Sequence, residues 1–376
     1  MVIPTAQDDP MHQHRLRRAG RTQRRAPLLA GALLLVGTLT ACGGGAVGSV
    51  GPIQPAQQPQ TLLPQARQEG KVVWYTTFAD SDVTGMISAF QKAYPGIKVE
   101  ALRLSADKLP ARLVTEQRGR TYNADVVSAD CEPVYQLIQA GTLAPYQVPQ
   151  VPPLPAQLRD LPAGYGNAVY ILTSAIAYNP TAVKAQHLQP PTSIEDLTQP
   201  GWKGRFSIDP EAVNWYESLI TAMGHTKALD LVKKLGDNAP LLVESHTQSL
   251  TEVQAGEPLA SVNAYAYKAA SLAKKTPTRM AFSNTDPEPT AAALAEIARN
   301  APHPAAAKLF LDWLMSTQGQ ASVVGITNHT SLDTQAKNDT SVWDPSKWKP
   351  AWSLPVITAD TYDRYLQEYQ KALHAV

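Results

Sequence analysis

Cysteine is almost absent from this 376-residue chain, which contains only Cys42 and Cys131. Two cysteines cannot build the dense disulfide framework of a small secreted domain, and they are too few for a thiolate metal site. A chain of this length therefore depends on packed hydrophobic cores for its stability.

Several catalytic and nucleotide-binding motifs are also missing. The sequence has no GxSxG or HExxH motif, no CxxC pair and no phosphate-binding loop of the GxxxxGK[ST] type. These absences remove common signatures of serine hydrolases, zinc peptidases, thiol oxidoreductases and ATPases. We therefore expect a protein that is not an enzyme and that requires no cofactor.

Neither sign of charge is in clear excess. The chain has 33 Lys and Arg against 32 Asp and Glu. The first 41 residues contain six Arg and two Asp, so residues 42–376 have a formal net charge of −3. A slightly acidic chain without a basic stripe argues against nucleic acid as a partner.

Only one long hydrophobic run is present, from Ala26 to Ala41, and it follows a segment with six arginines. A basic segment before a short apolar run is typical of a secretory signal, and the run is short for a membrane-spanning helix. It ends in Leu39-Thr40-Ala41-Cys42, which resembles a bacterial lipobox. We therefore predict that residues 1–41 are a lipoprotein signal peptide and that Cys42 is lipidated.

The segment after Cys42 is rich in Gly, Pro and Gln and carries no charge as far as Gln65. This composition is typical of a flexible linker, so residues 42–66 are predicted to be a tether. The mature protein is expected to be exported and lipid-anchored to the cell envelope, facing the periplasm or the extracellular space. This anchor is expected to be its only attachment to the membrane.

Strands and helices alternate after the tether. Lys71–Tyr75, Ile97–Leu102 and Ala124–Ser128 are short β-rich runs. Between the first two, apolar residues from Val83 to Tyr94 recur at helical spacing. This alternation predicts a mainly parallel sheet that is covered by helices on both faces.

A change of pattern near residue 168 predicts a second lobe. Ala168–Tyr178 is a longer β-rich run than any before it and fits a strand that crosses between lobes. A second set of strands and helices follows, and residues 279–294 are expected to cross back. We predict an α/β protein with two lobes joined by crossing hinge strands: residues 67–172 and 284–376 form lobe 1, and residues 173–283 form lobe 2.

Several stretches of the chain together resemble one family. They are VVWYTT at 72–77, AFQKAYPGIKVE at 89–100, ADVVSAD at 124–130, GTLAPY at 141–146, YNP at 178–180, IEDLTQPGWKGRFSI at 194–208 and NAPHPAAAKLFLDWLMSTQGQ at 300–320. In this order and at these spacings they are similar to the extracytoplasmic solute-binding proteins of ABC importers, in the branch that includes ferric-iron-binding proteins.

The resemblance implies a two-lobed periplasmic-binding-protein fold of type II, with a ligand held in the cleft between the lobes. It also implies that hinge closure captures the ligand, which is then delivered to an ABC permease powered by a cytosolic ATPase. Both partners are separate chains. The protein itself is expected to be a monomer.

The resemblance makes ferric iron or a ferric chelate the default ligand, as transported solute. Iron-binding members of this branch use adjacent tyrosines, whereas this chain has Tyr265 and Tyr267 with Ala266 between them. Residues two apart on a strand point to the same face, so both hydroxyls are expected to converge. A trivalent cation displaces phenol protons, which would make Tyr265, Tyr267 and Asp130 the metal ligands. The alternative is that the two tyrosines only pack.

Three further candidates in lobe 1 follow predicted strands. Thr76 and Thr77 come at the end of the first strand, where open α/β sheets bind ligands. Asp130 lies where the resemblance places an acidic ligand. It also stands just before a predicted helix, so it is either a ligand or the cap of that helix.

In lobe 2, Trp215 and Tyr216 offer aromatic faces for an organic ligand. His246 and Thr247 directly precede a helix predicted at Gln248–Ala255, whose free N–H groups favour an anion. These four residues support a second hypothesis, a small organic anion such as a carboxylate or a phosphorylated metabolite. Alternatively, His246 caps the helix and the aromatic residues belong to a core. A secreted enzyme and a surface sensor on the same fold are the remaining hypotheses.

Overall fold

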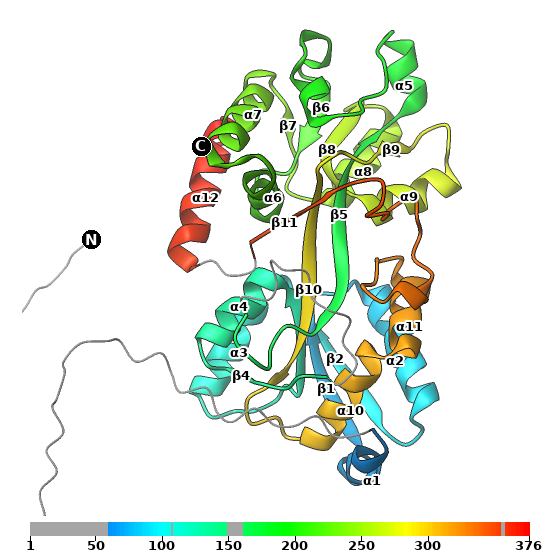
Figure 1. The fold of residues 1–376 in the computed structure, drawn as a ribbon, viewed down its shortest axis with the longest axis vertical. Helices are drawn as coiled ribbons and strands as arrows, with labels where there is room; N and C mark the ends of the chain where they lie inside the picture. Colours follow the sequence, from blue (N-terminus) through cyan, green and yellow to red (C-terminus); the bar gives the residue numbers. More distant parts are fainter. Residues whose placement is uncertain (1–58, 107, 149–160, 355–357) are drawn as a thin grey trace, which may run out of the picture. The chain divides into compact units, whose positions relative to one another are not determined.

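The computed structural model describes residues 59–106, 108–148, 161–354 and 358–376 (Figure 1). The predicted signal peptide, Cys42 and most of the predicted tether lie outside these residues. Within them, strands and helices alternate along the chain, which confirms the predicted α/β class.

The N-terminal strands form the parallel part of the sheet in lobe 1. β1 (Lys71–Thr76) pairs in parallel with β2 (Lys98–Arg103) on one side and with β3 (Val126–Asp130) on the other. Helices α2 (Asp80–Ala93), α3 (Lys108–Arg118) and α4 (Cys131–Gln139) connect or follow these strands. β1 is rich in buried apolar residues because helices cover both faces of the sheet.

Two long antiparallel strands join the lobes (Figure 1). β5 (Ala168–Tyr178) and β10 (Glu288–Ala298) pair with each other. In lobe 1, β10 also pairs with β3 and with the short β4 (Leu143–Ala144). Toward lobe 2, β5 pairs with β8 (Ala260–Tyr265) and β9 (Ala281–Ser283). The crossing strand therefore has the predicted bounds, and β10 is the return.

The sheet continues into lobe 2 through β8, which pairs in parallel with β6 (Phe206–Ile208), and β6 pairs in parallel with β7 (Leu241–Leu242). Five helices pack around these strands: α5 (Pro180–Ala185), α6 (Val213–Met223), α7 (His225–Asp237), α8 (His246–Ala255) and α9 (Ala266–Lys275). Short 3-10 turns lie at Ile194–Thr198 and Pro200–Trp202. The strand order through the described sheet is β2-β1-β3-β10-β5-β8-β6-β7.

Each lobe has its own hydrophobic core. In lobe 1, α10 (Pro304–Met315) packs with α2 and β1, and Phe90, Phe310 and Trp313 lie in ring contact with one another. Helix α11 (Thr317–Thr327) follows, and then a 3-10 turn at Thr334–Ala336. Two separate cores are what two bodies joined by a hinge would require.

The C-terminal helix differs from the predicted domain division. Residues 284–376 were assigned to lobe 1, yet α12 (Ala359–Ala372) packs on α6 and α7 of lobe 2. Tyr369 is fully buried in the lobe 2 core, and its hydroxyl donates to the backbone oxygen of Asp209 at 2.9 Å. Gly236 allows this approach, because a Cβ there would collide with the backbone of Ala372. The chain thus returns to lobe 2 after β11 (Pro350–Trp352), which pairs with β10.

The predicted tether extends too far toward the first strand. Helix α1 (Pro59–Glu69) occupies its last described part and packs on α10. Leu62 and Ala66 are buried in the lobe 1 core, and the carboxylate of Glu69 accepts hydrogen bonds from the first backbone N–H groups of α10. The sequence around α1 has the composition of a linker, but Leu62 and Ala66 are four residues apart and so lie on one face of the helix, which packs on lobe 1.

This docking predicts that Leu62→Ala destabilises the protein by about 2–5 kcal/mol, because it removes buried methyl groups from a packed core. Gln65→Ala is the matched control, since Gln65 is exposed on the same helix. Urea unfolding of both variants measures the difference. Equal stability of the two variants would mean that α1 is an undocked part of the tether.

Candidate functional site

The candidate site lies where the two lobes meet. Lobe 1 contributes the segments that follow β1 and β3, together with part of β5, and lobe 2 contributes the junction of β8 with α9 and the start of α8. Contacts between the lobes are direct here, since the ring of Tyr267 in lobe 2 lies 4.2 Å, centroid to centroid, from that of His329 in lobe 1.

Asp130 is the last residue of β3 and holds the N-cap position of α4, but its side chain makes no capping hydrogen bond. Burial raises the pKa of its carboxyl to about 6, and no positive side chain among the described residues offsets that effect. The place of Asp130 at the start of α4 fits the hypothesis that it caps this helix, but the lack of a capping hydrogen bond does not. Asp130 therefore presents an uncompensated carboxylate between the lobes.

The rings of Tyr265 and Tyr267 lie in contact, but not through the shared strand face that the sequence predicted. Tyr265 ends β8, and Tyr267 lies in the first turn of α9, so the two do not share a strand face. Their rings are stacked with centroids 6.0 Å apart and planes inclined by 25°. Burial raises the pKa of both phenols, and the charge of Asp130 raises them further. The turn from strand to helix thus brings the rings together beside Asp130.

Tyr170 and His329 complete an aromatic stack across the lobes. Tyr170, in β5, lies flat on the ring of His329 with centroids 4.0 Å apart, and His329 in turn contacts Tyr267. Burial lowers the pKa of His329 to about 3, with the nearby charge of Lys268 as a second cause. A neutral imidazole therefore separates a tyrosine of lobe 1 from a tyrosine of lobe 2.

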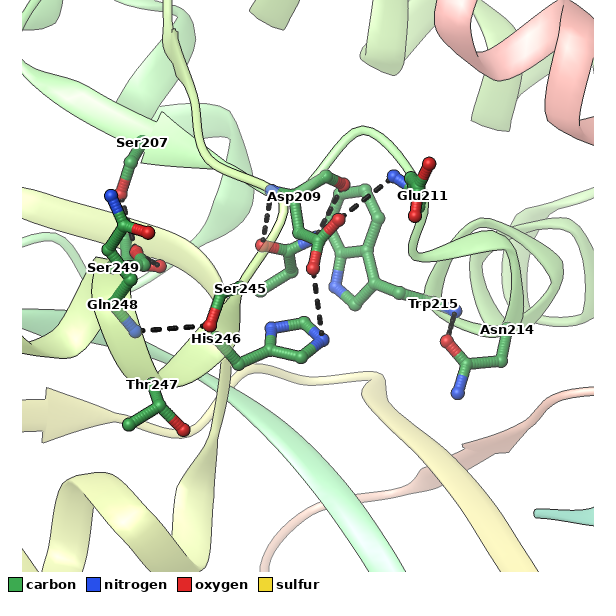
Figure 2. Close-up of polar contacts among 12 residues, drawn as sticks. Ser207, Asp209, Glu211, Asn214, Trp215, Ser245, His246, Thr247, Gln248 and Ser249 are labelled. Atoms are coloured by element: carbon green, nitrogen blue, oxygen red, sulfur yellow. Dashed lines mark hydrogen bonds and ion pairs between the residues drawn. The ribbon is translucent and has the colours of Figure 1, made fainter. Parts of the chain in front are cut away.

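His246 is the first residue of α8, and Ser245 caps the helix by accepting a hydrogen bond from the backbone of Gln248 (Figure 2). Its Nε2 points to the carboxylate of Asp209 at 3.5 Å (Figure 2), and its ring lies 4.1 Å from that of Tyr265. Burial lowers the pKa of His246 to about 4, and the charge of Lys268 lowers it further, so the imidazole is neutral at pH 7 and the contact with Asp209 is not an ion pair there. The helix-cap alternative for His246 is wrong, because Ser245 has that role.

Lys268 lies between the two tyrosines and the start of α8. Its ammonium is 5.9 Å from the ring centroids of both Tyr265 and Tyr267, and it donates to the hydroxyl of Thr247 at 2.7 Å. Burial lowers the pKa of Lys268, while the charge of Asp82 acts in the opposite direction. Thr247 is exposed and reaches the site through this lysine.

The two threonines after β1 have structural partners. Thr76 is fully buried, and its hydroxyl bonds to that of Ser128 at 2.8 Å and accepts from the backbone N–H of Phe78. Thr77 is half-buried, and its hydroxyl bonds to Tyr170. Of the two, Thr77 reaches the aromatic stack, whereas Thr76 ties β1 to β3.

Trp215 and Tyr216 belong to the core of lobe 2, which is the alternative that the sequence left open. Tyr216 is fully buried, stacks on Tyr369 and donates its hydroxyl to Glu368. Trp215 is 3% exposed and packs in the same core. Both rings therefore pack against other side chains of the lobe 2 core. Their position on α6 turns them toward α12, which the sequence could not show.

Four residues of the site were missed: Tyr170, His329, Lys268 and Asp209. Tyr170 lies in the predicted crossing strand, and Lys268 directly follows the candidate ligand Tyr267. Their places in the sequence could therefore have indicated both residues. His329 follows Asn328, whose left-handed backbone (φ 59°) ends α11 and returns the chain toward the site. Only the fold reveals that turn.

Two general properties were checked over the described residues. No group of three or more His, Cys, Asp or Glu side chains there is arranged to hold a metal ion. None of the described helices is both long enough and apolar enough to cross a membrane.

Comparison with known sequences gives a family. A family model described as bacterial extracellular solute-binding protein matches residues 76–321. An uncharacterized protein of Haemophilus influenzae is 24% identical over 299 residues, which are 76% of this chain and 84% of that protein.

Solved structures share the fold. AfuA from Actinobacillus pleuropneumoniae, with fructose-6-phosphate bound, is 21% identical with a TM-score of 0.70, over 82% of this chain and 99% of that one. Iron-bound HitA from Pseudomonas aeruginosa is 20% identical with a TM-score of 0.68, over 80% and 99%. FutA from Trichodesmium, in complex with iron and citrate, is 20% identical with a TM-score of 0.64, over 81% and 99%. The two-lobed architecture is therefore the predicted one.

The electrostatics of Asp130 predict that Asp130→Asn stabilises the protein without added solute at pH 7.5 by about 1–3 kcal/mol, because an uncompensated buried charge is removed. A carboxyl with a raised pKa stabilises the fold at low pH and loses that contribution as pH rises through about 6. Urea unfolding should therefore show a smaller gain at pH 4.5. An equal or lower stability of the variant at pH 7.5 would contradict an uncompensated Asp130.

Proposed function

The chain belongs to the bacterial extracellular solute-binding proteins, and from this premise we propose that it captures ferric iron or a ferric chelate between its lobes. Membership makes it an exported solute-binding protein of the ABC-transporter type. The specific solute is the proposal. One observation carries it: the rings of Tyr265 and Tyr267 lie beside the carboxylate of Asp130, which no positive side chain in the described part of the chain compensates.

The chemistry of this oxygen set suits a hard trivalent cation. Hard cations prefer oxygen ligands, and phenolate and carboxylate groups both supply them. Without a cation the two tyrosines keep their protons, because burial and Asp130 both raise their pKa. Bound Fe(III) would displace those protons, since a nearby cation reverses the local electrostatics. The cation would then compensate the buried negative charge of Asp130.

The origin of the ligands links binding to closure. Asp130 belongs to lobe 1, and Tyr265 and Tyr267 belong to lobe 2. A cation that binds all three is stabilised only when the lobes are together, so it shifts the population to the closed form. HitA and FutA, whose structures contain iron, have the same fold, and this likeness supports the proposal.

Iron binding predicts a colour. The protein with Fe(III)-citrate should develop the red-orange absorption of phenolate-to-iron charge transfer, and Tyr265→Phe and Tyr267→Phe should each lose most of it. Tyr122→Phe is the control, since Tyr122 is exposed outside the site. Absorbance titration measures the effect. A colourless wild-type protein that is also not stabilised by Fe(III)-citrate would refute the iron proposal and leave the solute-binding class intact.

The second candidate is a small organic anion, and Lys268 favours it. Its ammonium lies between two aromatic rings near the first turn of α8, where backbone N–H groups and the positive end of the helix dipole attract anions. The AfuA structure with fructose-6-phosphate shows that this fold accommodates a phosphorylated sugar in that protein. The two candidates combine in a ferric chelate, whose organic anion would lie on the Lys268 side.

An anion at this position predicts that Lys268→Gln weakens binding at least tenfold. A thermal-shift screen of carboxylates and sugar phosphates would identify the responsive anion, and calorimetry would compare the variants. Lys203→Gln, which removes an exposed lysine of lobe 2, is the control. Equal affinities in Lys268→Gln and the control, or no responsive anion in the screen, would remove the second candidate.

The remaining parts of the proposal concern the surroundings of the protein. We infer that it is lipid-anchored through Cys42, acts as a monomer, and delivers its solute to a separate permease driven by an ATPase. A surface sensor or a secreted enzyme on this fold would lack such partners. Genes for a permease and an ATPase beside this one would support the importer over both.

A further inference from the structure

A cavity with a volume of about 220 Å³ lies between α8 and α9 of lobe 2 and reaches the end of α11 in lobe 1. Side chains of the two lobe 2 helices line it, together with Asn328, which directly follows α11. We call this space the α8–α9 cavity. It is smaller than the roughly 300–1,000 Å³ of pockets for drug-sized ligands, so it suits a small solute or one part of a solute.

Lys268 is the only charged side chain among the described residues that line this cavity. Its ammonium donates to the hydroxyl of Thr247 at 2.7 Å, and no carboxylate in the described part of the chain forms an ion pair with it. Asp82 and Arg103 of lobe 1 act on it electrostatically, but in opposite directions. The cavity thus contains one positive charge without a counter-ion, which favours a ligand with one negative charge.

The wall beyond Lys268 is apolar. Leu250 of α8 and Leu272 of α9 line the cavity and belong to one hydrophobic cluster of lobe 2. Tyr267, whose ring also contacts His329 of lobe 1, adds an aromatic side chain. Methylene groups of a ligand would gain by burial against these side chains.

Two polar side chains that also line the cavity have partners within lobe 2. Thr251 donates its hydroxyl to the backbone oxygen of Thr247 at 3.0 Å, and the amide of Gln254 donates to the hydroxyl of Thr276 at 2.8 Å. These bonds reduce what the cavity offers to the hydroxyl groups of a sugar. Hydroxyl groups buried here without partners would weaken binding.

We propose that the α8–α9 cavity binds a short-chain monocarboxylate, with its carboxylate on Lys268 and its aliphatic chain between Leu250 and Leu272. Lys268 and Leu272 are four residues apart on α9, which is about 6 Å along the helix axis and suits a chain of about four or five carbons. The inference rests on the second candidate function, a small organic anion, and deepens it by naming the class of the anion.

The place of the cavity brings its occupant into contact with both lobes. Asn328 belongs to lobe 1, whereas α8 and α9 belong to lobe 2. A ligand that touches all three is held most tightly when the lobes are together, so its binding shifts the population to the closed form. The cavity is therefore placed to take part in solute capture.

The test compares pentanoate with acetate, which lacks most of the aliphatic chain, and with pentanamide, which lacks the charge. Pentanoate should raise the melting temperature of the protein. By calorimetry it should bind at least tenfold more tightly than either analogue, because it alone both pairs with the ammonium and buries a chain. Lys268→Gln should weaken pentanoate binding at least tenfold, and Lys203→Gln should leave it unchanged.

Two cavity-filling variants test the place of the chain. Ser271→Leu on α9 and Thr251→Leu on α8 enlarge side chains that line the cavity, so each should reduce the preference for pentanoate over acetate to less than threefold. Thr226→Leu is the matched control, since Thr226 is exposed on α7, which does not line the cavity. Variants on two helices, each checked by its unfolding curve, guard against loss of folding in one of them.

Absence of pentanoate binding, equal affinities for pentanoate and acetate, or a preference that both filling variants leave unchanged would overturn the proposal. If a sugar phosphate binds through Lys268 while pentanoate does not, the second candidate function stands and the monocarboxylate inference alone fails. If no anion in the screen responds, the second candidate function fails as well. The Fe(III)-citrate colour is independent of all these results.

Discussion

Negative charge buried between two lobes is the constraint on which the site depends. Asp130 comes from lobe 1, and burial raises the pKa of its carboxyl to about 6, with no positive side chain among the described residues as an opposing cause. Closing the lobes without a ligand therefore carries an electrostatic cost. The proposed cation would remove that cost only when both lobes surround it, so its binding energy would shift the population to the closed form. Under this proposal, the selectivity of the cleft and its closure have the same physical cause.

The aromatic stack supplies the uncharged part of the interface. His329 lies between Tyr170 and Tyr267, and its imidazole is neutral because burial lowers its pKa to about 3. A protonated His329 would introduce a charge into this stack, beside the ammonium of Lys268. The neutral ring instead provides a flat, uncharged contact between the two lobes.

Local patterns predicted the elements well, whereas contacts between distant segments escaped them. β5 has its predicted bounds because eleven β-rich residues leave little alternative. The assignment of α12 to lobe 1 was wrong because its partners α6 and α7 lie more than 120 residues earlier in the chain. Tyr265 and Tyr267 were predicted to converge through a shared strand face, and they converge at a strand–helix turn instead. His329 carried no local signal, since its role depends on rings from two other segments.

A raised carboxyl pKa does not by itself distinguish a binding residue from a structural one, and Glu296 shows why. Its pKa is also raised to about 8 by burial, but its carboxylate accepts hydrogen bonds from the backbone N–H of Gly166 and from the backbone and side chain of Asn167. These donors fix the loop before β5 to β10, so Glu296 has a complete set of partners within one lobe. Burial also raises the pKa of Asp130, but its side chain makes no capping hydrogen bond to α4. The difference lies in the partners: hydrogen bonds within one lobe satisfy Glu296, whereas Asp130 lacks the capping bond that its position offers, which fits its proposed role as a ligand.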